Sequence, residues 1–262
     1  MNLQRVKAVL WKDLLDLRKN RALLGSMTIF PLVIVFVPVM IVYSYTHQTD
    51  VGSLKTIALY YHAELGPRDT GAAFLIQKIL TDWFGMYLLM PVFVPVLISS
   101  QSVVGEKEKR TLEPLLASPI SGLELLVGKS LASLIPSLVI CWASFALFCV
   151  SVDWVAWSTF RELLLPNRMW LFGVGLIAPL FAVFGNGVSV LVSARVSESR
   201  LAQQISGLVT LPIIGMVGSQ LAGWLKGGVA FYAIEGAVVL LLDLILAWLS
   251  IRLFDRERLM GQ

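Results

Sequence analysis

The side chains best placed to do chemistry are two carboxylates inside an apolar stretch. Glu235 and Asp243 interrupt the run of residues 227–251, and a helix would place both on one broad face. Asp243 lies near the middle of the run and Glu235 nearer its start. A carboxylate inside a membrane span is costly and by default suggests a functional site, such as a contact for a cationic substrate or a proton carrier. The structural alternatives are a neutral, protonated acid or pairing with one of three polar side chains: Asn186, Gln203 or Gln220.

Patterns typical of catalysis, metal binding or nucleotide binding are missing from the sequence. Cys141 and Cys149 are the two cysteines; on one helix they would lie about 12 Å apart, too far to bridge. With two histidines, the chain offers no Cys/His cluster for a metal. Gly122 and the Gly-Lys-Ser of residues 128–130 come closest to a phosphate-binding loop, but five residues separate them where the motif needs four. We therefore expect no catalytic, metal or ATP site in this chain.

The composition places the chain in a membrane. Of its 262 residues 57% are apolar and 15% are charged, against roughly 45–50% and 25% in soluble domains. These values exclude a soluble enzyme and a disordered chain. The net charge of +4 is too small to suggest a nucleic-acid partner.

Five stretches without Asp, Glu, Lys or Arg are long enough to span a bilayer, which takes about 20 apolar residues. They cover residues 22–49, 83–105, 130–152, 169–194 and 201–225, and the run of 227–251 makes a sixth. We therefore predict an all-α integral membrane protein, a single domain over residues 1–262 with six transmembrane helices. In two of the stretches small residues recur every four positions: Gly185, Ser189 and Ser193 in one, and Gly215, Ser219 and Gly223 in the other. This spacing predicts either packing within the bundle or a dimer seam.

The basic residues predict the orientation. If the N-terminus is cytoplasmic, 15 of the 21 Lys and Arg residues lie inside and 6 outside, as the positive-inside rule requires. Both termini are then cytoplasmic.

Residues 1–21 are expected to form an amphipathic helix at the membrane surface. Leucines and a valine recur at helical spacing, opposite a stripe of charged residues, and Trp11 suits the headgroup region. This helix is either a plain anchor or a lever that touches a cytoplasmic partner.

A charged element is predicted between spans two and three, over residues 105–120. Glu106 and Arg110 have the i,i+4 spacing that supports a helical turn, whereas Pro114 favours a break. Ser121 and Glu124 form a capping box that begins the next long helix. The simplest interpretation of this element is a solvated loop helix without a functional role.

The segment GEKEKRTLEPLLASPISGLELLVGK, residues 105–129, resembles the permease subunits of ABC-2 type transporters, as does SARVSESRLAQQIS at residues 193–206. The layout of six spans after an amphipathic helix is also similar to that family. The resemblance implies that residues 105–120 are a coupling helix that docks on a separate ATPase. The contact residues would then be Glu106, Glu108, Arg110, Thr111 and Leu112.

The resemblance also implies an assembly. Two cytoplasmic ABC ATPase subunits would bind the ATP and Mg²⁺, and a second permease, a copy or a homologue, would complete the exporter in a prokaryotic cytoplasmic membrane. Membrane lipid is the other expected partner. The alternative function is an ATP-independent transporter, channel or scaffold, which would not need the element of residues 105–120.

Overall fold

The computed structural model describes residues 2–47, 52, 55–56, 59, 71–102, 104–108, 120–222, 224 and 228–260. Within these ranges the chain is helical and contains no strand. The helices are α1 Leu3–Lys19, α2 Arg21–His47, α4 Ala72–Tyr87, α5 Leu89–Ser102, α6 Val104–Glu108, α8 Gly122–Phe160, α9 Arg168–Phe172, the π-helical turn η1 Gly173–Ile177, α10 Ala178–Arg195, α11 Ser199–Gly207, α12 Thr210–Leu221 and α13 Val229–Met260.

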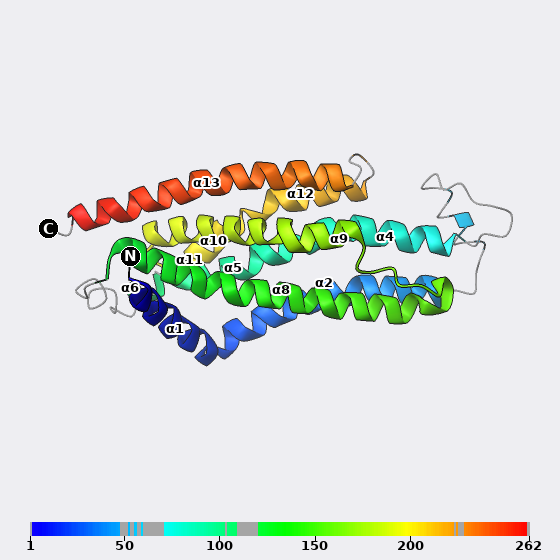
Figure 1. Cartoon of the computed structure of the whole chain (residues 1–262), viewed down its shortest axis with the longest axis horizontal. Coiled ribbons are helices and arrows are strands. Elements are labelled where there is room, and N and C mark those ends of the chain that lie inside the picture. The colour runs from blue at the N-terminus through cyan, green and yellow to red at the C-terminus, as the bar shows by residue number, and fades with distance from the viewer. Residues whose placement is uncertain are drawn as a thin grey trace.

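Six of the helical stretches are long and apolar enough to cross a membrane, which confirms the predicted fold class. They are Arg21–His47, Ala72–Glu106, Gly122–Phe160, Arg168–Arg195, Ser199–Gln220 and Val229–Arg252. They run roughly side by side along the long axis of the molecule, and both ends of the chain lie at the same end of the bundle (Figure 1). We call this the terminal end.

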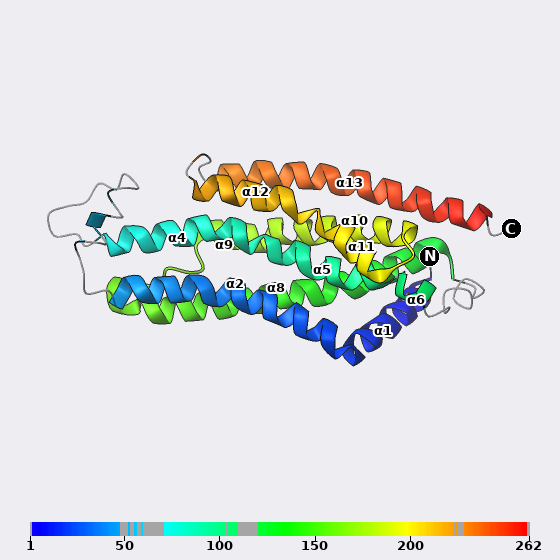
Figure 2. The ribbon, with the colours of Figure 1, turned by 180° about the vertical axis from the view of Figure 1, so that it is seen from behind.

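The spans form layers around one core (Figure 2). Helices α12 and α13 lie on one side of the α4–α5 and α9–α10 layer, and α2 with α8 lies on the other. The broadest contact joins α10 to α5, and α13 packs on α10 while α2 packs on α8. The chain turns sharply at Asn20, between α1 and α2, and we call this turn the α1–α2 elbow (Figure 2). Helix α1 thereby packs on the first turns of α8.

Small residues on α10 allow the close contact with α5. A Cβ atom on Gly185 would lie 2.6 Å from the carbonyl oxygen of Val92, and the Ser189 hydroxyl donates to the carbonyl of Val96 at 3.4 Å. This stripe therefore packs within the bundle. Gly215 on α12 differs, because a Cβ atom there would meet nothing within 4 Å.

Two local signals begin and end helices as expected. The Ser121 hydroxyl accepts from the amide of Glu124 at 3.2 Å, and the Glu124 carboxylate accepts from the amide of Ser121 at 3.0 Å. This capping box begins α8, as predicted. Asn20 separates α1 from α2, and its side chain accepts from the amide of Leu23 at 3.1 Å.

Several spans differ in extent from the uncharged runs. Helix α8 has 39 residues, whereas the third run has 23. It extends because its charged residues are paired: Lys129 lies in an ion-pair cluster, and Asp153 accepts from the amides of Leu164 and Leu165 at 2.9 and 3.1 Å. Charge alone therefore did not mark the ends of this helix.

Both cysteines are buried and free. The carbonyl of Cys141 accepts a hydrogen bond from the Tyr87 hydroxyl at 2.6 Å, and Tyr87 stacks edge-on against Trp170 with centroids 5.3 Å apart. The Trp170 indole donates to the carbonyl of Leu80 at 3.2 Å. These contacts fix spans two, three and four to one another in the middle of the bundle.

Candidate functional site

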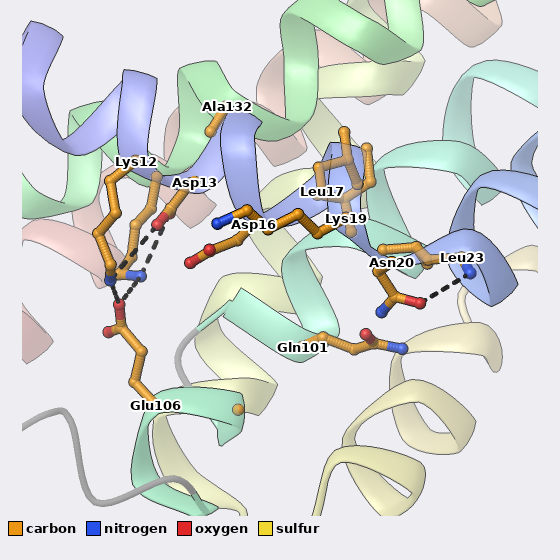
Figure 3. Close-up of a pocket in the computed structure, with 13 residues that line it drawn as sticks. Lys12, Asp13, Asp16, Leu17, Lys19, Asn20, Leu23, Gln101, Glu106 and Ala132 are labelled. Carbon is orange, nitrogen blue, oxygen red and sulfur yellow. Dashed lines mark hydrogen bonds and ion pairs between the residues drawn. The ribbon is translucent and has the colours of Figure 1, made fainter.

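Four charged side chains from three helices meet at the terminal end of the bundle (Figure 3). The Lys129 ammonium of α8 lies 3.0 Å from Glu106 Oε1 of α6 and 3.3 Å from Asp13 Oδ2 of α1. Lys12 of α1 donates to the same Glu106 oxygen and lies 3.7 Å from Asp13 Oδ1. We call Lys12, Asp13, Glu106 and Lys129 the charge cluster.

Burial makes the pairing in this cluster necessary. Lys129 is 3% exposed and Glu106 is 7% exposed, and a buried charge is strongly unfavourable unless it is paired. Burial lowers the pKa of Lys12, but the hydrogen bond to Glu106 and the negative charges of Glu106, Asp13 and Asp16 more than offset this effect, so its pKa lies above the ordinary value. Lys12 therefore stays cationic at physiological pH, and the cluster pairs two basic side chains with two acidic ones.

Close packing of α1 on α8 brings these charges together. A Cβ atom on Gly128 would lie 2.8 Å from the Cβ of Val9, so a side chain at this position would push the helices apart. The Glu124 carboxylate accepts from the amide of Asn2 at 2.6 Å and lies 3.7 Å from the Arg5 guanidinium. One acidic side chain thus caps the start of α8 and also anchors the start of α1.

Glu108 attaches α6 to a further helix. Its carboxylate accepts from the amide of Ser199 at 2.8 Å and from the Ser199 hydroxyl at 2.9 Å. Ser199 begins α11, whose own N-cap residue, Glu198, makes no side-chain capping bond. Glu108 therefore supplies the cap of α11 from a distant part of the chain.

The structure brings two of the five predicted coupling residues together with other helices. Glu106 contacts α1 and α8, and Glu108 contacts α11. Arg110, Thr111 and Leu112 lie outside the described residues. A contact of any of the five with an ATPase stays a prediction.

The two acidic residues in the apolar part of α13, Glu235 and Asp243, both lie on its buried side. Glu235 is 9% exposed and Asp243 is 7% exposed. Neither carboxylate oxygen of Asp243 has a hydrogen-bond partner among the residues that the structure describes. Of the partners proposed from the sequence, Asn186 accepts from two buried serines at 2.5 and 2.6 Å, and Gln220 accepts from a tyrosine hydroxyl at 3.2 Å.

Sequence reasoning missed three members of the charge cluster: Lys12, Asp13 and Lys129. Lys12 entered the prediction only as part of the charged stripe of the amphipathic helix, and Asp13 was not singled out. Lys129 appeared only as the last residue of the segment that resembles ABC-2 permeases and in the near-match to a phosphate loop, with no ion-pair partner assigned. The position of Lys129 in the sequence could have revealed its role. A lysine directly before an uncharged run of 23 residues needs an acidic partner if the helix is buried there.

The fold and the site together define the chain as an all-α integral membrane protein with six spans and a short charged helix tied to its terminal end. Comparison with protein families gives a match over residues 7–256 to the family described as ABC-2 family transporter protein, and the chain belongs to this family. It is thus a membrane permease of an ABC transporter, and membership of this family implies partnership with an ABC ATPase subunit. A comparison with curated proteins gave no match.

Proposed function

We propose that the chain is one transmembrane half of an ATP-driven exporter. Two such halves, identical or homologous, associate with two ATPase subunits, which are separate chains and bind the ATP and Mg²⁺. In this proposal both termini face the cytoplasm of a prokaryotic cell, so the terminal end of the bundle meets the ATPase. Family membership and the basic residues near both termini support this arrangement.

The main observation in support of the proposal is that α6 contacts several helices of the bundle. This short helix follows α5 with one residue between them. Its Glu106 contacts α1 and α8, while its Glu108 caps α11. A partner that displaces α6 therefore acts on spans two, three and five and on α1 at once, as a rigid-body coupling mechanism requires.

The proposal divides the roles of residues 105–120. Arg110, Thr111 and Leu112 contact the ATPase, whereas Glu106 and Glu108 hold the segment to the bundle. Reversing a docking charge or burying a new one should weaken the complex, because an unmatched charge at an interface costs several kcal/mol. Neutralising Glu106 should instead leave docking intact and impair the transmission of movement.

The test is co-expression with an ATPase encoded beside this gene. Arg110→Glu and Leu112→Asp should reduce co-purification of the ATPase, while Lys7→Glu, an exposed position on α1, serves as the matched control. Glu106→Gln should keep the ATPase bound but change the hydrolysis rate of the complex relative to the isolated ATPase.

Two results would contradict the proposal. Unchanged co-purification of the Arg110 and Leu112 variants would remove residues 105–120 as the docking segment. A stable, active permease to which no ATPase binds would favour the ATP-independent transporter, channel or scaffold instead.

A further inference from the structure

A cavity of about 540 Å³ lies beside the charge cluster. Its walls come from α1, the start of α2, the end of α5, α6 and the first turns of α8. The cavity thus lies between α1, the start of α2 and the bundle (Figure 3).

The position of the cavity places it at the depth of lipid headgroups. The uncharged part of the first span begins after Arg21, and that of the third begins after Lys129, so the charged and apolar parts of the chain meet at the cavity. Helix α1 exposes Trp11 to 66%, which suits the headgroup region of a bilayer. A lipid of the adjoining leaflet is therefore the molecule most available to fill the cavity.

The lining of the cavity is electrically balanced and has an apolar side. Six titratable groups line it, three lysines and three acids: Lys12, Lys19 and Lys129 with Asp13, Asp16 and Glu106. Leu17, Leu23 and Ile98 form an apolar wall. Such a lining favours a neutral amphiphile that carries both charges over an anion or a cation.

Two of these charged groups stand outside the charge cluster. Asp16 and Lys19 are exposed, and in the described part of the chain neither has an ion pair within 4 Å. Figure 3 shows both side chains lying along α1 in the direction of the charge cluster, while Gln101 of α5 lies on a separate wall of the cavity. An acceptor and a cationic donor from α1 thus line the same cavity.

We propose that this cavity binds a phospholipid with an ethanolamine headgroup. Its primary ammonium donates to the Asp16 carboxylate, and its phosphate accepts from the Lys19 ammonium. The first methylene groups of the acyl chains lie against Leu17, Leu23 and Ile98. A choline headgroup has no N–H to donate to Asp16, and an anionic glycerol headgroup has no cation for that carboxylate, so both bind less well.

The bound lipid would also act on the charge cluster. Lys12 and Glu106 line the same cavity, so the headgroup packs against the pair that joins α1 to α6. Lipid in this position holds the elbow against the bundle. Binding itself does not depend on the proposed transport function, so it is tested on the permease alone.

The experiment is native mass spectrometry of the purified permease with added phosphatidylethanolamine, phosphatidylcholine or phosphatidylglycerol. Wild type should retain the ethanolamine lipid in preference to the other two. Asp16→Asn/Lys19→Gln, which leaves the net charge unchanged, should weaken its apparent affinity at least tenfold. Lys7→Gln, an exposed lysine on α1 that does not line the cavity, should bind like wild type.

A second measurement guards against misfolded variants. Thermal unfolding should show that the ethanolamine lipid raises the Tm of wild type and of Lys7→Gln, and that this rise is lost in Lys19→Gln and in the double variant. Equal retention of the three lipids by wild type would overturn the proposal. So would a double variant that folds and binds the ethanolamine lipid as tightly as wild type.

Discussion

Replacing Lys129 tests whether the charge cluster fastens α1, α6 and α8 to one another. Lys129→Met keeps much of the apolar volume but leaves Glu106 and Asp13 with Lys12 as their cation. Breaking a buried ion pair by removing one partner costs about 3–5 kcal/mol. Because Lys12 still contacts both acids, we expect the free energy of unfolding to fall by about 2–3 kcal/mol, or roughly 30- to 150-fold in the unfolding equilibrium.

A double-mutant cycle separates this ion pair from other effects of the substitution. Glu106→Gln keeps the shape of the side chain and removes its charge, so it leaves Lys129 with Asp13 at 3.3 Å. If Lys129 and Glu106 act as a pair, their losses in the free energy of unfolding should not add. Lys129→Met/Glu106→Gln should then lose about 1–2 kcal/mol less than the sum of the two single variants.

The assay is unfolding in mixed micelles with increasing denaturing detergent, followed by tryptophan fluorescence. Lys7→Met is the control, because Lys7 is an exposed lysine on α1 outside the charge cluster and its replacement should change the free energy of unfolding by less than about 0.5 kcal/mol. The reasoning is refuted if Lys129→Met costs no more than Lys7→Met, or if the losses of the two cluster variants simply add.

Three further predictions concern the rest of the molecule. A cysteine at Thr70 should react with an impermeant thiol reagent added outside the cell and one at Ser197 should not, because 15 of 21 basic residues lie on the proposed inner side; the reverse labelling pattern would invert the topology. Asp243→Asn should not lower the free energy of unfolding, because its buried carboxylate has no hydrogen-bond partner to lose among the described residues; a loss would assign it a structural partner. Gly185→Ala should cost about 1–3 kcal/mol through its clash with α5, whereas Gly175→Ala, which meets nothing within 4 Å, should not; equal thermal stabilities would contradict the packing.

The features that the sequence predicted are those that depend on neighbouring residues. Long uncharged runs revealed the six spans, since a helix must be apolar along about 20 residues to cross a bilayer. The capping box of Ser121 and Glu124 revealed the start of α8, because its two hydrogen bonds join residues three apart.

The features that the sequence did not predict depend on contacts between distant residues. Lys12 and Glu106 are 94 positions apart, and Glu108 caps a helix that begins 91 positions later. Nothing in the local pattern tells whether a charge near the end of a span lies in water or pairs with another helix. The buried position of Lys129 follows from its pairing with Asp13 and Glu106.

Helix α8 is the longest of the described helices and, like α2 and α13, is continuous from one end to the other. Its 39 residues run through Pro136 and extend about 58 Å, whereas spans two, four and five are interrupted at Leu88, at the π-helical turn Gly173–Ile177 and at residues 208–209. A force on the charge cluster would therefore turn α8 as one rod, while spans two, four and five flex at their interruptions. A rotation of about 5° around its midpoint would move each end by about 2.5 Å in opposite directions. If one end of α8 moved inward at one membrane face, its other end would thus move outward at the opposite face.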